Sequence, residues 1–274
     1  MNPQEIAENY NKLASYWSGD QFNRENGIAQ HQKALQFLSK KRNAIDIGCG
    51  SSGRFIDLML EAGFEVEGLD ISPEMLRLAK EKHPKVEFHL ADICAWEFPR
   101  KYDFISAWDS IWHAPLVCHE QILMKLCDGL ADGGVLIFTS GGIDRPGDST
   151  NPCMGQPMYH AALGIPKLLE VIPRGGCICR HLEYDQYPEL HIYLIVQKAA
   201  PGEEGCRREL REETCLEIEI EFGARVIRDR PKARGSAKSR EAAPPLTLKA
   251  SPAPHVVVET VEEWCSAALS RVRR

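Results

Sequence analysis

The chain has 274 residues, of which 43% are hydrophobic and 26% charged, and its formal net charge is −6. This length accommodates one large domain, or one domain with an appendage, and the hydrophobic share is enough for a sizeable core. The acidic balance argues against nucleic acid or an anionic membrane as the main partner. No apolar run is long enough to span a bilayer.

The ten cysteines form neither a C-x-x-C pair nor a Cys/His cluster at zinc spacing, so we expect no metal site. Several of them lie in apolar segments, as buried reduced thiols do. The first residues are acidic and polar, which is not typical of a signal or transit peptide. These features favour a cytoplasmic protein, and they leave its oligomeric state open.

Two helices are predicted before the first strand, at residues 3–17 and 28–38, from apolar residues at helical spacing. Strands and helices then alternate, which predicts a doubly wound α/β fold with a parallel sheet covered on both faces. The expected strands are 44–47, 65–69, 86–90, 104–107 and 135–139, and the expected helices are 54–62, one opening at Pro73, and 115–130. Two more strands are expected near 180–184 and 191–196.

A glycine-rich turn follows the first of these strands, in the sequence Asp46-Ile-Gly48-Cys49-Gly50. Glycine takes backbone angles that side chains forbid and lets a ligand approach the main chain. The helix that begins near Ser52 points its free N–H groups at the same ligand. An acid at Asp46 suits a cofactor with a cationic end and no phosphate. S-adenosylmethionine has that chemistry.

Further segments follow in a recognisable order, and at this point the chain resembles the class I S-adenosylmethionine-dependent methyltransferases. The matching segments are 46–50, 64–72, 86–93, 102–108, 130–138 and 191–198. The resemblance covers roughly residues 1–199. It implies a mostly parallel seven-stranded Rossmann-like sheet with an antiparallel last strand, and methyl transfer to a small-molecule acceptor. Residues 200–274 are then a C-terminal appendage.

The resemblance also implies roles for single residues. Asp70 holds the two ribose hydroxyls, Asp92 meets the adenine amine, and Asp46 serves the ammonium end of the cofactor. The complete set of expected cofactor-binding residues is Asp46, Gly48, Cys49, Gly50, Asp70, Ile71, Asp92, Ile93 and Trp108. Each aspartate alone would also suit a helix N-cap or a turn.

Methyl transfer from a sulfonium requires alignment of the nucleophile and exclusion of water, and a general base helps when the acceptor carries a proton. His113, after the fourth strand, and Tyr159 are the candidate catalytic residues. Plain packing is the alternative for both side chains. Residues 141–174 break the alternation. The stretch 140–152 is rich in turn formers, and we expect a long loop here that covers the substrate.

The appendage contains a second signature, in which Glu209, Glu212 and Glu213 resemble the magnesium-binding glutamates of the Nudix hydrolase box. Cys215 replaces the usual glycine, so a fragment of that box or a plain charged helix is the expected reading. Residues 231–254 have the composition of a disordered linker, and 261–272 the spacing of a short helix.

Two further enzyme classes stay open. Gly48, Gly50 and Gly53 also satisfy the G-x-G-x-x-G pattern of nicotinamide oxidoreductases. A Nudix-type diphosphohydrolase is the other, and a relative that has the fold but no catalytic activity is a third alternative.

Overall fold

The computed structural model describes residues 1–19, 22–200, 217–220 and 227–230. The described residues divide into two units, of which the first contains residues 1–199. The second contains an antiparallel pair of strands, β10 (Glu217–Ile220) and β11 (Ile227–Arg230). The predicted Nudix-like glutamates, the linker and the last helix lie outside the described residues. No helix in the described part of the chain is long and apolar enough to cross a membrane.

The first unit is built on a seven-stranded sheet with the strand order β3-β2-β1-β4-β5-β9-β8. The pairs among β1 to β5 are parallel, whereas β9 runs antiparallel to both of its neighbours. The strands are β1 (Asn43–Ile47), β2 (Glu65–Asp70), β3 (Glu87–Leu90), β4 (Tyr102–Ala107), β5 (Leu130–Gly141), β8 (Cys177–Tyr184) and β9 (His191–Lys198). The predicted α/β fold is confirmed.

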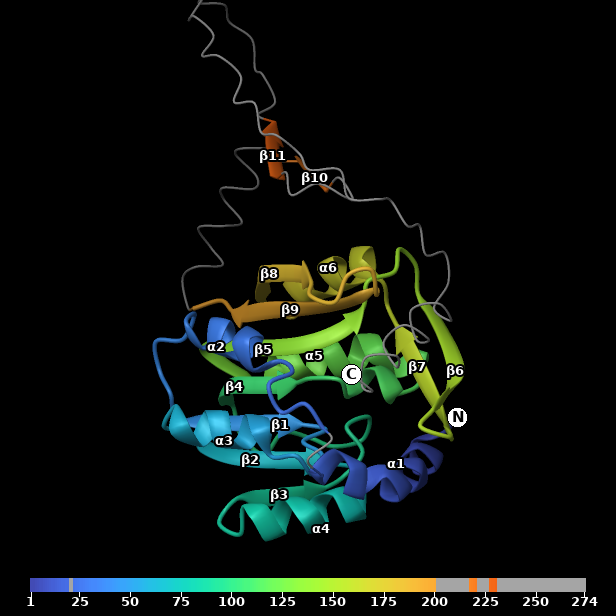
Figure 1. Ribbon diagram of the computed structural model, residues 1–274. Coiled ribbons are helices and arrows are strands. Elements are labelled where there is room, and N and C mark those ends of the chain that lie inside the picture. Colours follow the sequence, from blue (N-terminus) through green and yellow to red (C-terminus); the bar gives the residue numbers. More distant parts are fainter. Residues whose placement is uncertain (20–21, 201–216, 221–226, 231–274) are drawn as a thin grey trace, which may run out of the picture. The chain divides into compact units, whose positions relative to one another are not determined.

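Helices cover both faces of this sheet (Figure 1). One face packs against α2 (Ile28–Leu35), α3 (Arg54–Glu61) and α4 (Pro73–Lys82), and the other against α5 (His119–Gly129) and α6 (Ile165–Arg174). Neighbouring residues of one strand alternate between the two cores: Phe104 of β4 belongs to the first and Ile105 to the second. Because both faces are buried, apolar side chains of the strands point to both sides of the sheet.

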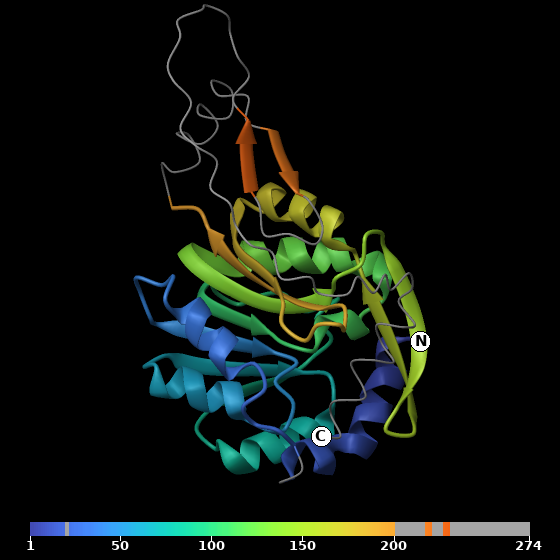
Figure 2. The same ribbon diagram turned by 45° about the horizontal axis from the view of Figure 1, so that its top comes forward.

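The N-terminal helix α1 (Pro3–Ser18) begins with a capping box, in which the Asn2 side chain accepts from the Glu5 N–H and Glu5 accepts from the Asn2 N–H. Its apolar face packs on β7 (Gln156–Ala162), where Ile6 and Leu13 join the same buried cluster as Met158. Figure 2 shows α1 beside this strand at one end of the sheet. The helix therefore covers the end at which β1, β2 and β4 finish.

The expectation of a long irregular loop after the fifth strand is wrong. β5 continues to Gly141, and β6 (Gly147–Cys153) and β7 then form an antiparallel hairpin before α6. Met154 and Gly155 make its two-residue turn, with φ of 48° and 81°. Positive φ at both positions is the geometry that matches the twist of a hairpin. Only residues 142–146 separate β5 from β6, and the turn formers from Gly147 to Pro152 lie within β6.

The predicted helix at 115–130 begins only at His119. A 3₁₀ turn, η2 (Leu116–Cys118), precedes α5, and a second one, η1 (Ile111–His113), follows β4. Pro115 explains the delay, because it sits at the extended position before η2 with ψ of 135°.

Candidate active site

A cavity lies where the carboxyl ends of β1, β2 and β4 meet α1. This edge of an open α/β sheet is the usual place for small molecules and cofactors to bind. The lining includes Ile6, Tyr10, Trp17, Gly48, Cys49, Gly50, Ser51, Arg54, Asp70, Ile71, Met75, Asp92, Ile93, Trp108, Asp109, Ser110, Ile111 and His113. Most of the predicted site residues are thus brought together.

The turn after β1 shows why glycine is needed here. Gly48 has a φ of 72°, and a Cβ at this position would lie 2.3 Å from Cβ of Ser110. The N–H groups of Gly48 and Cys49 both donate to the Leu69 carbonyl, at 2.7 and 3.0 Å. Gly50 has a φ of 57° and open space beside its Cα. A ligand can therefore approach the backbone directly at Gly50.

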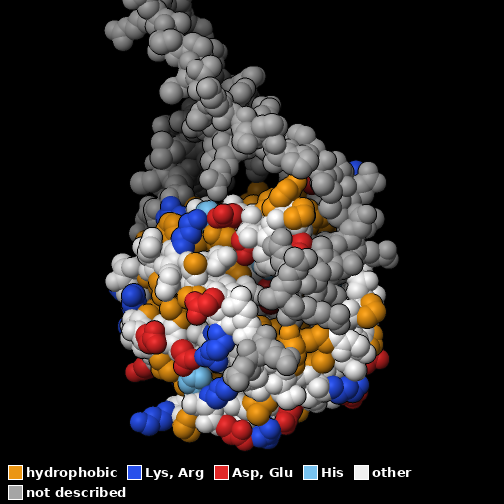
Figure 3. Space-filling model, in the orientation of Figure 1, with side chains coloured by type: hydrophobic (Ala, Val, Ile, Leu, Met, Phe, Trp, Pro, Cys, Tyr) orange, Lys and Arg blue, Asp and Glu red, His pale blue; other side chains and the backbone are white. Residues whose placement is uncertain are grey.

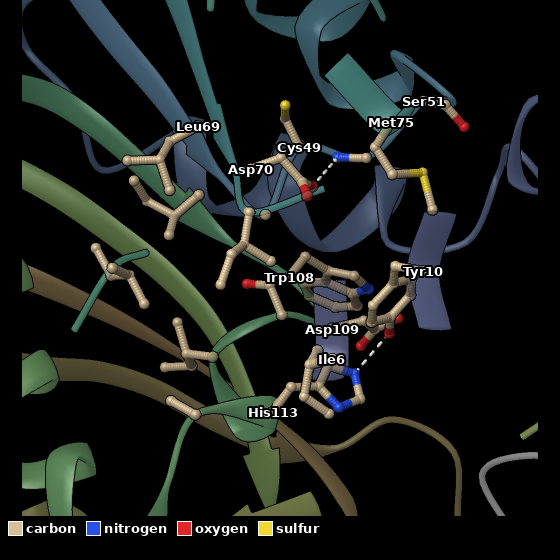
Figure 4. Close-up of a pocket in the computed structure, with 18 of the residues that line it drawn as sticks. Ile6, Tyr10, Cys49, Ser51, Leu69, Asp70, Met75, Trp108, Asp109 and His113 are labelled. Atoms are coloured by element: carbon tan, nitrogen blue, oxygen red, sulfur yellow. Dashed lines mark hydrogen bonds between the residues drawn. The ribbon is translucent and has the colours of Figure 1, made fainter. Parts of the chain in front are cut away.

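Asp70 ends β2 and faces the turn. Its Oδ2 accepts from the Gly50 N–H at 2.9 Å, and its Oδ1 accepts from the Ser72 N–H at 2.8 Å (Figure 4). Burial raises the pKa of Asp70, while these N–H donors lower it. Each carboxylate oxygen keeps a second lone pair, so the side chain can still accept from two neighbouring hydroxyls.

Asp92 occupies the corresponding place after β3. Its Oδ1 accepts from the Cys94 N–H at 2.9 Å, which orients the carboxylate within the turn. Ile71 and Ile93 line the cavity from the ends of β2 and β3. The two isoleucines and Asp92 together offer an apolar slot with one acceptor, which suits a flat ring that carries an amine.

Asp46 lies behind the lining rather than in it, with only 2% of its surface exposed. Burial raises its pKa to about 6, although a hydrogen bond from Ser106 and the charge of Arg54 lower it. Ser106 Oγ also lies 3.0 Å from Nε2 of His31, whose Nδ1 donates to the Gly27 carbonyl at 2.7 Å. Burial lowers the pKa of His31 to about 3, so this histidine is neutral. These hydrogen bonds link Asp46, Ser106 and His31 behind the glycine turn and support the turn from the side away from the cavity.

Trp108 and His113 line the cavity after β4, as predicted, whereas Tyr159 does not line it. The Tyr159 hydroxyl accepts from the Leu116 N–H at 3.1 Å, and its carbonyl accepts from Nδ1 of His113 at 2.7 Å. Burial lowers the pKa of His113 well below its ordinary value. His113 is therefore neutral, and Tyr159 contributes by orienting it.

Three buried polar atoms of lining residues point to a ligand. Nε1 of Trp17, Nε1 of Trp108 and Oγ of Ser110 have no hydrogen-bond partner among the residues that the structure describes. Buried polar groups in native proteins almost always have a partner. Together with the open space at Gly50, these three atoms fit a cofactor that brings its own polar groups.

Sequence reasoning missed Tyr10, Arg54 and Asp109 as lining residues. Tyr10 was visible only as one position of the apolar face of α1, and Arg54 only as the first residue of α3. Asp109 has a φ of 51°, which the sequence does not reveal. Arg54 is partly buried beside the rings of Phe22 and Phe55, with its guanidinium carbon 4.7 and 4.2 Å from their centres.

Comparison with known proteins agrees with this geometry. Residues 44–134 match the family model described as a methyltransferase domain. A trans-aconitate 2-methyltransferase of Methylobacterium radiotolerans is 39% identical over 102 residues, which cover 36% of this chain and 38% of that protein. A ubiquinone biosynthesis O-methyltransferase of Bordetella bronchiseptica is 29% identical over 150 residues, which cover 53% of this chain and 56% of the relative.

The chain thus spans between about two fifths and somewhat over half of these two relatives. Among solved structures, the complex of DhpI with SAH has a TM-score of 0.55 and 18% identity, and the match covers 73% of this chain and 97% of that one. The described chain therefore has the fold of the class I S-adenosylmethionine-dependent methyltransferases. Residues 44–134 of this fold carry the match to the methyltransferase domain model.

Proposed function

We propose that this chain transfers the methyl group of S-adenosylmethionine to a small-molecule acceptor. The observation that carries the proposal is the placement of Asp70: its carboxylate, fixed by the Gly50 and Ser72 N–H groups, faces the cavity beside an open glycine. We infer that Asp70 accepts the ribose hydroxyls and that Asp92 accepts the adenine amine. Gly48, Cys49 and Gly50 form the backbone cradle, and Ile71 and Ile93 hold the ring.

S-adenosylmethionine supplies an activated methyl group on a sulfonium. The chain's own residues then have to orient the acceptor and exclude water. Ile6, Tyr10 and Trp17 of α1 lie on the cavity and close it from the side opposite the sheet. Trp108 and His113 line the part of the cavity that lies away from Asp70 and Asp92, and we infer that the acceptor binds there. A neutral His113 can hold a hydrogen bond but is a weak base, so its role is orientation rather than proton removal.

Several observations support a small acceptor in a cytoplasmic enzyme. Ile6, Tyr10 and Trp17 of α1 line one side of the cavity, and we infer that it takes a compact acceptor rather than a polymer. On the face shown in Figure 3, lysine and arginine side chains are interspersed with acidic ones. Cys49, Cys94, Cys118, Cys127, Cys177 and Cys179 are free thiols, as in a reducing compartment. We propose that residues 1–199 are the catalytic domain and 200–274 an appendage.

The test is calorimetric titration with S-adenosylhomocysteine of the wild type, an Asp70→Ala variant and an Asp103→Asn variant. Asp103 is the matched control, because it is a buried carboxylate of β4 that accepts from Arg42 and lies outside the lining. We expect micromolar binding by the wild type and by Asp103→Asn, and at least about a tenfold loss in Asp70→Ala. Unchanged affinity in Asp70→Ala, beside a folded protein, would remove Asp70 from the site.

A further inference from the structure

Lys125 of α5 packs its side chain against the turn that follows β3. Its ammonium donates to the carbonyl of Trp96 at 2.8 Å and to the carbonyls of Ile93 and Cys94 at 3.2 Å. An ammonium has three N–H donors, so each donor has an acceptor in this turn. Only 11% of the side chain is exposed, and Oε1 of Glu97 lies 3.5 Å from the ammonium. The hydrogen bonds of Lys125 are therefore all made to one turn.

This segment, residues 92–96, is a single helical turn that is not continued. The Asp92 carbonyl accepts from the N–H groups of Ala95 and Trp96 at 3.0 and 2.9 Å, and Oδ1 of Asp92 accepts from the Cys94 N–H at 2.9 Å. A single turn leaves its later carbonyls without partners inside the turn, and a cation is stabilising at that end. Lys125 supplies both the missing donors and the charge.

The same turn faces the cavity with its first residues. Asp92 and Ile93 line the cavity, whereas Lys125 does not. The Ile93 carbonyl that accepts from Lys125 belongs to a residue that the proposed function places against the adenine ring. Lys125 therefore acts on the cavity from behind, through the backbone of the turn.

The ribose end of the cavity is fixed by other contacts. The Asp70 carboxylate accepts from the N–H groups of Gly50 and Ser72, at 2.9 and 2.8 Å. None of these three residues belongs to the turn that Lys125 binds. A displacement of residues 93–96 should therefore change recognition of the base and leave recognition of the ribose intact.

We propose that Lys125 is a positioning residue that gives the cavity its selectivity for a purine with a 6-amino group. This inference rests on the proposed function, in which Asp92 accepts from that amine. An ionised carboxylate can only accept hydrogen bonds, and it repels an oxygen atom at the same position. Discrimination of this kind requires placement within about 0.5 Å, and Lys125 fixes the backbone that carries Asp92.

The test compares S-adenosylhomocysteine with S-inosylhomocysteine, in which a carbonyl oxygen replaces the 6-amino group. Both ligands are titrated by calorimetry into the full-length wild type and its variants. Lys125→Met keeps the apolar stem of the side chain and removes the three donors. Lys125→Gln is the second variant, which keeps a polar end that stops one atom short of the ammonium. Lys198→Met is the matched control, because Lys198 also donates to a carbonyl, that of Gly175 at 2.8 Å, and does not line the cavity.

We expect the wild type to bind S-adenosylhomocysteine at least about tenfold more tightly than S-inosylhomocysteine. Both Lys125 variants should lose about tenfold in affinity for S-adenosylhomocysteine and less than about threefold for S-inosylhomocysteine. Lys198→Met should keep both affinities within about twofold of the wild type. A lysine that only stabilised the fold would not change the ratio of the two affinities.

Hydrogen exchange of the backbone amides tests the positioning step in the free protein. The N–H groups of Cys94, Ala95 and Trp96 close the turn. They should exchange at least about tenfold faster in Lys125→Met than in the wild type, and at the wild-type rate in Lys198→Met.

An unchanged ratio of the two affinities in both Lys125 variants overturns the proposal, and so does unchanged exchange of the three amides. A wild type that binds both ligands equally tightly also overturns it, while leaving the proposed function in place. A wild type that binds neither ligand contradicts the proposed function and the selectivity together.

Discussion

The buried ion pairs of His191 make the stability of the fold depend on pH in a defined direction. The pKa of His191 is lowered by burial and raised more strongly by Asp109 and Asp185, from 6.5 to about 9. A group whose pKa is higher in the folded state stabilises that state fully below its unfolded pKa. This stabilisation is lost as the pH rises from 6.5 through about 9.

The rise from 6.5 to about 9 corresponds to about 3 kcal/mol of unfolding free energy. The assay is urea unfolding of the wild type and of a His191→Gln variant at about pH 6 and about pH 9.5. We expect the wild type to be more stable than the variant at the lower pH, and this advantage to shrink by about 3 kcal/mol at the higher pH.

An NMR titration of the His191 ring provides the control, since its midpoint in the folded protein should lie near 9. A stability difference that does not change with pH, or a midpoint near 6.5, would refute the reasoning. Either result would mean that the ring is not held as a cation between its two carboxylates.

Three other changes have defined outcomes. Gly48→Ala should abolish S-adenosylhomocysteine binding in calorimetry and destabilise the fold by about 2 kcal/mol or more, because the added Cβ would lie 2.3 Å from Cβ of Ser110. Gly133→Ala is the control, since Gly133 also has a positive φ, of 75°, but open space around it. This variant should show only the smaller cost of backbone strain and should still bind S-adenosylhomocysteine. The His113 ring should stay neutral in an NMR titration from about pH 8 down to about pH 5.5, because burial lowers its pKa, and a midpoint near 6.5 would contradict the burial of the ring. Phe138→Ala should lower the free energy of unfolding in urea by about 3–5 kcal/mol, since this side chain of β5 is fully buried against α5 and α6. A decrease below about 1 kcal/mol would contradict that packing.

Periodicity predicted most of the fold. Every strand of the large sheet was expected, because buried parallel strands are short apolar runs bounded by turn residues. The helices were found from their apolar faces. The boundaries were less accurate: β5 is seven residues longer than its five-residue prediction, since Leu130 pairs with Tyr102 and Gly141 with His191. Such cross-strand pairing is a tertiary contact that one segment does not encode.

The hairpin of β6 and β7 was missed for a related reason. Its strands contain Gly147, Asp148, Asn151 and Pro152, which have low strand propensity. What stabilises the hairpin lies elsewhere in the chain: α1 packs on β7, and Asn9 donates to the Pro157 carbonyl at 2.7 Å. Local propensity is overridden by these long-range contacts.

The glycine turn and the aspartates of the cavity could be predicted from the sequence, and the residues at its other end only in part. Gly48, Asp70 and Asp92 follow strands directly, so their common edge is a consequence of the topology. Tyr10 and Asp109 reach the cavity through a distant helix and a strained backbone, which no local pattern shows. Asp46 and Tyr159 were proposed as direct participants, and the structure places both outside the lining, where they support other groups.

The central claim is that this cavity holds S-adenosylmethionine. The most direct measurement is calorimetric titration of the full chain with S-adenosylhomocysteine and, separately, with NAD. We predict micromolar binding of S-adenosylhomocysteine and no detectable binding of NAD, because Asp70 at the end of β2 and the open Gly50 in the turn after β1 suit a phosphate-free nucleoside. Binding of NAD without S-adenosylhomocysteine, or of neither ligand, would contradict the account.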